Sequence, residues 1–472
     1  MNDLTRLPAR EVLKLLIRRE VSPLDLIDVA LQRIEETDGS INALPTLCIE
    51  RARDHAKRLI TKKIDDAPRR YLYGLPIAVK DLTNVAGVRT TMGSPIYAEN
   101  IPARSSYSVE MLEAKGAIVL AKSNTPEFGA GANTFNEVFG KTLNPWDTRT
   151  TCGGSSGGSA AALAAGQVWL ATGSDLGGSL RIPASYCSVV GLRPSPGRVP
   201  QGPKDFPFWT LGVEGPMGRT VGDAALMLDA ESGFHPEDPI SYPPPMEPYV
   251  DSVDHPTPLG RVAFSPDLGI APLDPEVKSI CTRAAGLFET MGATVEEATI
   301  DLHDAEDIFQ TLRAAQFAAS MAPLLRDHRE QLKPEIVWNI EKGLSLTPEQ
   351  VSMAERARGA LIRRTTEFFS QHDLLLCPTV VVPPFDVDVR YVTVVDDVIL
   401  ESYVGWLILT FALTLTACPS ISVPCGFTQG GLPVGLQILA PPRGEAQLIS
   451  AAALFEEAAN LAERVPLDPR VR

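Results

Sequence analysis

The sequence lacks the usual marks of a metal-binding, nucleic-acid-binding or secreted protein. Its six histidines and seven cysteines are scattered over 472 residues, without a CxxC or HExxH pair, so no spacing suits metal ligation. The formal net charge of −15 disfavours nucleic acid and anionic membranes as partners. No signal-peptide hydrophobic segment follows the N-terminus. We therefore expect no metal or other cofactor, no nucleic acid and no membrane.

Long hydrophobic runs are also scarce. The most apolar segment, 403–418, is shorter than the ~20 residues that cross a bilayer, and it contains three threonines. We interpret it as a buried helix, with a membrane-dipping element as the alternative. The odd number of cysteines, several of them in apolar runs (Cys187, Cys418 and Cys425), is typical of buried thiols in a reducing cytoplasm, where we expect the protein.

The chain does contain an alternation of helix and strand signals. Ser22-Pro23-Leu24-Asp25 has a capping serine, a proline and an acid where helices start, and Asp274-Pro275 opens a helix that Gly292 ends. We predict strands at six short apolar runs: 77–79, 117–121, 168–171, 262–264, 374–376 and 420–423. The alternation predicts an α/β fold with a mostly parallel central sheet that is buried on both faces.

One stretch breaks this alternation. Residues 236–258 are rich in proline and poor in apolar residues, which is typical of an exposed connector. The connector could separate two domains. Equally, the strand-like runs before and after it could pair in one sheet and form a single domain.

Two segments rich in glycine and serine, 152–159 and 173–181, are the most unusual feature of the chain. Both are flanked closely by apolar structure. So many glycines indicate unusual backbone angles or a close approach, and such loops can aim several N–H groups at one anion, a phosphate or a developing oxyanion. Neither the GxxxxGK[ST] phosphate loop nor the GxGxxG dinucleotide loop fits them.

A serine in these segments could be activated by either of two bases. Residues 153–157 match GxSxG, the nucleophile elbow of α/β-hydrolases, with Ser155 as nucleophile and His372 as base. The His-Gly-Gly-Gly oxyanion motif of those enzymes is absent. Alternatively, Lys80 follows the strand-like run 77–79, and burial beside the loops could lower its pKa enough to make it a general base.

The sequence resembles the amidase signature family from about residue 8 to residue 462. Six blocks carry the resemblance: 74–81, 116–129, 144–146, 153–166, 173–198 and 419–437. It implies a single compact α/β domain around a large mixed, mostly parallel sheet flanked by helices, which we adopt over two domains. Within residues 1–472 we expect the following parts: an N-terminal helical region (1–65), a catalytic core (66–235), the connector (236–258) and the rest of the same domain (259–472).

The resemblance also implies the site. It makes Lys80 the base, Ser155 the bridging serine and Ser179 the nucleophile that forms an acyl-enzyme, with a cis peptide bond between Gly154 and Ser155. Backbone N–H groups around the nucleophile would form the oxyanion hole: Leu176, Gly177, Gly178 and Ser179. Three further residues would support the catalytic groups, the last two by pairing their charges: Ser156, Asp175 and Arg181.

The family includes stand-alone amidases and the glutaminase subunit of a tRNA-dependent amidotransferase. A glutaminase needs charges in its pocket to hold a zwitterionic amino acid, and residues 406–411, which we expect to line the pocket, offer no acid. We therefore predict an amidohydrolase of small apolar or aryl amides, with carbamates or esters as extensions. It would act without a partner protein, as a monomer or a homodimer. A catalytically inactive scaffold is the non-enzyme alternative.

Overall fold

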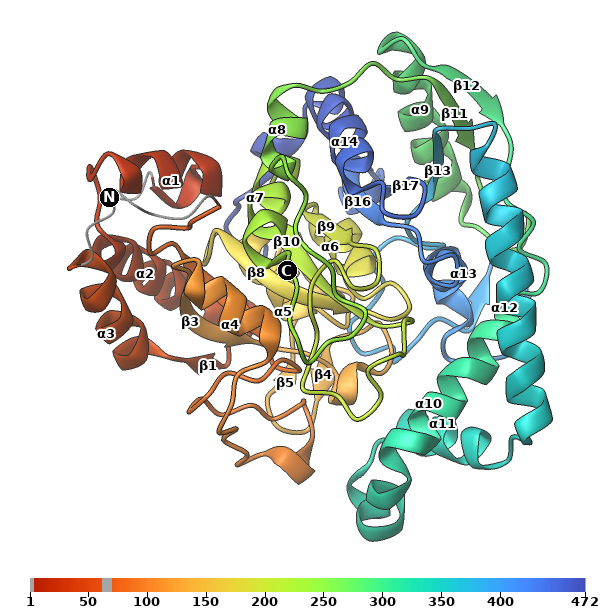
Figure 1. Ribbon diagram of the computed structural model, residues 1–472, viewed down its shortest axis with the longest axis horizontal. Coiled ribbons are helices and arrows are strands. Elements are labelled where there is room, and N and C mark those ends of the chain that lie inside the picture. The colour runs from red at the N-terminus through yellow and green to blue at the C-terminus, as the bar shows by residue number, and fades with distance from the viewer. Residues whose placement is uncertain (1–3, 62–69, 472) are drawn as a thin grey trace.

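Eleven strands form one mixed sheet at the centre of the computed structural model, which describes residues 4–61 and 70–471 (Figure 1). In their order across the sheet, the strands are β1 (Thr46–Leu47), β3 (Ile118–Ser123), β2 (Pro76–Lys80), β8 (Leu170–Asp175), β10 (Val213–Gly218), β9 (Val190–Arg193), β16 (Ser420–Phe427), β17 (Pro433–Leu439), β13 (Leu374–Pro378), β11 (Arg261–Phe264) and β12 (Thr294–Glu297). Each of the six predicted strand runs overlaps one of these strands. Because β9 pairs with β16, strands from both sides of the connector share the sheet, and the chain is a single α/β domain.

The predicted mixed sheet is confirmed, but fewer of its strand pairs are parallel than predicted. The pairs β2–β3, β2–β8, β11–β12 and β11–β13 are parallel, and the remaining pairs in the sheet are antiparallel. Part of the reason is a hairpin: only a few residues separate β16 from β17, which is too short for the crossover that parallel strands need. Apolar runs reveal that a strand is buried, but not the direction in which it runs.

Helices cover both faces of the sheet and extend from it at one side (Figure 1). Their bounds are α1 (Ala9–Ile17), α2 (Pro23–Ile41), α3 (Ile49–Ile60), α4 (Tyr107–Ala114), α5 (Gly157–Ala164), α6 (Arg181–Cys187), α7 (Val221–Glu231), α8 (Tyr249–Asp254), α9 (Pro275–Thr290), α10 (Ala305–His328), α11 (Pro334–Leu344), α12 (Pro348–Phe369), α13 (Ile408–Thr414) and α14 (Glu445–Ala459). Two of them confirm the predicted helix starts: α2 has a complete capping box at Ser22 and Asp25, and α9 is capped by Asp274. We refer to α10, α11 and α12 as the helical arm.

The connector 236–258 is less exposed than predicted. It contains the short helix α8, whose first residue, Tyr249, is buried. The backbone N–H groups of Tyr249 and Val250 donate to the Asp229 carboxylate of α7, at 2.8 and 3.1 Å. These bonds hold the second half of the connector against the core.

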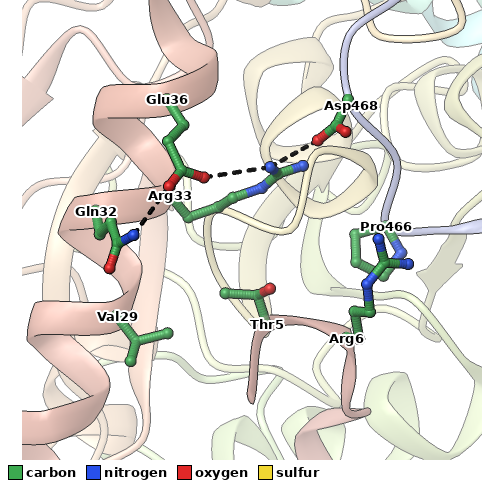
Figure 2. Close-up of a pocket in the computed structure, with 8 residues that line it drawn as sticks. All are labelled: Thr5, Arg6, Val29, Gln32, Arg33, Glu36, Pro466 and Asp468. Atoms are coloured by element: carbon green, nitrogen blue, oxygen red, sulfur yellow. Dashed lines mark hydrogen bonds and ion pairs between the residues drawn. The ribbon is translucent and has the colours of Figure 1, made fainter. Parts of the chain in front are cut away.

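The C-terminal segment returns to α2, where Arg33 anchors it (Figure 2). Arg33 donates to the Asp468 carboxylate at 2.8 Å and to the Ala165 carbonyl at 2.7 Å, and it lies 3.5 Å from Glu36. A cavity of about 240 Å³ lies beside this cluster. The bonds place the last residues against the N-terminal helices, while the predicted boundary at 65 and 66 lies outside the described residues.

The apolar segment 403–418 is buried, as predicted. It contains the helix α13, all of whose residues are buried. Across residues 4–61 and 70–471, no helix combines the length and the apolar character that crossing a membrane requires. Cys187 and Cys418 are buried thiols, and Cys425 is half-buried.

Candidate active site

Lys80 is the last residue of β2, between β3 and β8, and its side chain is fully buried. Its Nζ lies 2.7 Å from the Ser155 Oγ, 2.9 Å from the Ser156 Oγ and 3.0 Å from the Ser174 Oγ. The strand therefore delivers one amine to three hydroxyl groups of the two glycine-serine segments. Among the residues that the structure describes, no carboxylate forms an ion pair with it.

Burial lowers the pKa of Lys80 to about 7, although Asp175 and Glu214 act in the opposite direction. Removing water disfavours the charged ammonium, and the two carboxylates offset this effect only in part. A neutral amine has one lone pair as well as N–H donors, so it can accept a proton from one of the surrounding hydroxyls. Near neutral pH this lysine is poised to act as a base.

The first glycine-serine segment carries Ser155 into the loop before α5. The peptide bond between Gly154 and Ser155 is cis, as the family resemblance implies. Gly129 covers the serine: its φ is +68°, and a Cβ there would lie 3.2 Å from the Ser155 Oγ. A side chain at position 129 would therefore be strained and would crowd the hydroxyl.

The second segment carries Ser179 between β8 and α6, and Ser179 faces the same cavity as Ser155. The Ser156 N–H donates to the Ser179 carbonyl at 3.2 Å, which ties the two segments together. Ser174 also contacts Lys80, from near the end of β8.

The loop before Ser179 has N–H groups without an acceptor in the described structure, and a hydrogen bond to Asp175 fixes its conformation. The Gly178 N–H donates to the Asp175 carboxylate at 2.9 Å, so it already has an acceptor. The N–H groups of Leu176, Gly177 and Ser179 have no hydrogen-bond acceptor within the described part of the chain. The family resemblance grouped all four as one set, and the structure separates Gly178 from the others.

Asp175 is the centre of a buried ionic cluster. Arg181 donates to it through two nitrogens, each at 2.9 Å, and Arg193 lies 3.2 Å away. Burial opposes ionisation, but the charges of Arg181 and Arg193 hold the pKa of Asp175 well below its usual range. The predicted pairing of Asp175 with Arg181 is confirmed. Arg193 was missed because a lone arginine in the apolar strand β9 gives no local signal.

The apolar segment 406–411 does not line the catalytic cavity, and the prediction that it does was wrong. Its Trp406 and Phe411 are buried in the core. Thr410 instead supports the nucleophile loop from behind, because its hydroxyl donates to the Gly177 carbonyl at 2.7 Å and its carbonyl accepts from Arg181 at 3.0 Å. The segment therefore supports the loop before Ser179, and its apolar character does not describe the lining of the cavity.

The cavity has a volume of about 240 Å³ and contains charges that the sequence did not reveal. It is lined by Leu82, Thr83, Phe128, Gly129, Ser155, Ser174, Asp175, Leu176, Ser179, Gln201, Gly212, Val213, Glu214, Arg313 and Phe317. Burial raises the pKa of Glu214, against the effect of a hydrogen bond from Ser108. Arg313 reaches the cavity from the helical arm, far along the chain from the serines.

His372 lies away from this cavity. Its ring stacks on Phe368, and its Nε2 lies 2.8 Å from the Glu296 carboxylate of the edge strand β12. The alternative in which His372 activates Ser155 was therefore wrong. No group of metal-ligating side chains was found among residues 4–61 and 70–471.

Known sequences and structures place the chain in a family. The sequence profile of the Amidase family matches residues 25–449, which is most of the chain. The chain belongs to the amidase signature family. The matched range spans Lys80, Ser155 and Ser179, and this amidase is an amidohydrolase.

Relatives of this amidase include both predicted types. The acylamidase of Rhodococcus erythropolis is 35% identical over 468 residues, which cover 98% of this chain and 98% of that protein. The glutamyl-tRNA(Gln) amidotransferase A-subunit of Anaeromyxobacter dehalogenans (strain 2CP-C) is 33% identical over 482 residues, 96% of each chain. The crystal structure of a bacterial aryl acylamidase superposes with a TM-score of 0.89 at 27% identity, covering 98% of this chain and 99% of that chain.

Replacing Asp175 with asparagine should destabilise this amidase. The change would leave Arg181 and Arg193 buried without a carboxylate, and breaking a buried pair in this way costs about 3–5 kcal/mol. The urea concentration at the unfolding midpoint should fall clearly. Glu11→Gln, which removes an exposed pair with Lys14, is the matched control and should change the midpoint little. Equal midpoints for the two variants would contradict a stabilising role for the cluster.

Proposed function

We propose that this amidase hydrolyses small aryl or alkyl amides on its own, through an acyl-enzyme on Ser179 that Lys80 and Ser155 activate. The observation that carries the proposal is the buried Lys80 amine, with a pKa lowered to about 7, at 2.7 Å from the Ser155 hydroxyl beside a cavity that also exposes Ser179.

The proposed proton relay runs from Ser179 through Ser155 to Lys80. Lys80 Nζ accepts the Ser155 proton, Ser155 accepts the Ser179 proton, and the Ser179 Oγ attacks the amide carbon. The proton then returns through Ser155 to the leaving nitrogen as the C–N bond breaks, and an ester remains on Ser179. Water attacks this ester by the same relay, releases the acid and restores both serines.

The oxyanion would be held by the nucleophile loop. The N–H groups of Leu176, Gly177 and Ser179 are the available donors, and a preorganised donor of this kind is typically worth ~3 kcal/mol in the transition state. Gly178 would act indirectly, since its N–H bond to Asp175 fixes the loop. Thr410 fixes the same loop from the opposite side.

The substrate class rests on the cavity and the relatives. Leu82, Phe128, Leu176 and Phe317 give the cavity an apolar and partly aromatic lining, which suits an aryl or alkyl group. One relative is an acylamidase and one similar structure is an aryl acylamidase. Carbamates and esters present the same carbonyl to Ser179, so they are further candidates.

A glutaminase subunit of an amidotransferase is the second candidate. One observation favours it: Arg313 and Glu214 both line the cavity, and a zwitterionic amino acid needs groups of both charge types. The similarity to the glutamyl-tRNA(Gln) amidotransferase relative agrees with this alternative. Against it, burial raises the pKa of Glu214, so this carboxyl is a poor partner for an ammonium group.

A comparison of two substrates distinguishes the stand-alone amidase from the glutaminase subunit. We expect the purified chain to release aniline from a simple anilide with a kcat/KM far above that for ammonia release from glutamine. Ser179→Ala measured on both substrates is the control for contaminating activity. Faster turnover of glutamine, seen only in the presence of charged tRNA and a partner protein, would overturn the stand-alone proposal.

A further inference from the structure

Arg313 is a buried cation without a carboxylate partner. Only 4% of the residue is exposed, and it lines the catalytic cavity from α10. Among the described residues no Asp or Glu lies within ion-pair distance of its guanidinium. A buried charge left uncompensated costs several kcal/mol, so most buried arginines are paired, as Arg181 is with Asp175.

Neutral groups hold Arg313 in place and leave part of it free. One terminal nitrogen donates to the Asn339 side chain, and the other donates to the Tyr403 hydroxyl at 2.5 Å. The guanidinium also lies over the Phe317 ring at 4.6 Å and the Tyr403 ring at 5.3 Å. A guanidinium has five N–H donors. These two bonds use two of them, so further donors remain for a ligand in the cavity.

The other cations near Arg313 have carboxylates beside them. Burial, opposed by Glu335 and Glu127, lowers the pKa of Lys333 to about 8, and the nearby charges of Arg390 and Arg313 lower it further. Lys333 and Arg390 therefore both have carboxylate neighbours, whereas Arg313 has none within ion-pair distance among the described residues. Glu214 lines the same cavity, but it forms no ion pair with Arg313 in the described structure.

We propose that Arg313 binds a carboxylate on the substrate, so that the preferred substrates are amides whose acyl or amine part carries a carboxylate group. The inference rests on the proposed function, because it adds one group to the same aryl or alkyl amide. A planar carboxylate fits the fork of an arginine and supplies the counter-charge that the protein omits. The apolar side chains of the cavity would then contact the aryl or alkyl group of the substrate, and Arg313 would bind its carboxylate.

Two matched substrate pairs test the inference. The first pair carries the carboxylate on the acyl side: N-phenylsuccinamic acid against N-phenyl-4-oxopentanamide, in which a methyl ketone replaces the carboxylate. The second carries it on the amine side: para-acetamidobenzoate against para-methylacetanilide. In the unmodified protein, the charged member of at least one pair should have a kcat/KM about tenfold or more above its neutral partner, because a charge-assisted hydrogen bond is worth about 1.5–3 kcal/mol.

Variants then show whether Arg313 causes the preference. Arg313→Gln should raise KM for the charged substrate more than for its neutral partner, and so bring the ratio of the two kcat/KM values near one. Arg313→Lys keeps the charge without the fork and should give an intermediate ratio. Lys342→Gln removes a cation of the arm that stacks on Trp338 and does not line the cavity, so it should keep the full preference.

Three outcomes would decide against the proposals separately. If the neutral member is preferred in both pairs by the unmodified protein, the carboxylate inference is overturned without any variant. If Arg313→Gln lowers turnover of charged and neutral substrates equally, together with the melting temperature, Arg313 only packs the arm against the cavity. If no anilide of either kind acylates Ser179, the proposed function itself is wrong.

Discussion

Ser179→Ala should lower kcat by several powers of ten while the protein stays folded. The substitution removes the proposed nucleophile, and the loss falls on chemistry rather than on packing. Within the described structure, Ser179 is tied to its neighbours through its carbonyl, which accepts from the Ser156 N–H, and the alanine variant keeps that bond. Circular dichroism and the melting temperature should therefore match those of the unmodified protein.

Covalent labelling identifies the nucleophile directly. A fluorophosphonate should modify Ser179, and a peptide map should find the label there. Ser174 is a useful comparison, because it lines the same cavity and also contacts Lys80, so Ser174→Ala should still be labelled at Ser179. Label on Ser155 would contradict the assignment and make Ser155 the nucleophile.

Lys80→Arg should be as damaging as Lys80→Ala. Guanidinium keeps its proton at any pH that proteins tolerate, so an arginine would preserve positive charge but not the base. The pKa of Lys80 is lowered to about 7 by burial, so the amine is neutral above this pH and protonated below it. In the unmodified protein, kcat/KM for an anilide should therefore fall as the pH drops through about 7.

A histidine could produce a similar midpoint, so His372 provides the control. It contacts Glu296 and Phe368 rather than the cavity, and His372→Ala should keep both the activity and the pH profile. If kcat/KM of His372→Ala no longer fell as the pH dropped through about 7, the lysine mechanism would be ruled out. Retained turnover in Lys80→Ala would rule it out too. A shallow profile with no fall near neutral pH would rule it out as well.

The expected elements and catalytic residues have a local basis in the sequence. The start of α2 is encoded within four consecutive residues, since Ser22 and Asp25 cap each other's backbone. The strand ending at Lys80 is marked by its apolar run, and the two glycine-serine segments owe their conformation to glycines in the same few residues. Gly178 illustrates this: its φ is +122°, and a Cβ there would lie 2.3 Å from the Thr410 Oγ1.

The mistaken predictions concerned contacts between distant segments. The segment 406–411 packs behind the nucleophile loop rather than in the pocket, because Thr410 and Arg181 meet across more than 200 positions of the chain. Polarity in a local window shows that a segment is buried, but not what it is buried against. The same limit explains why strand direction in the sheet was misjudged.

The sequence by itself determined the family, the helix starts, the buried strands and the three residues that we propose for the chemistry. These features depend on short stretches whose backbone requirements are written in adjacent residues. The tertiary structure alone decided the direction of the strands, the pairing of Arg193 with Asp175 and the entry of Arg313 and Glu214 into the cavity. Single charged residues carry no periodic signal, and only the folded chain brings them together from β9, β10 and α10.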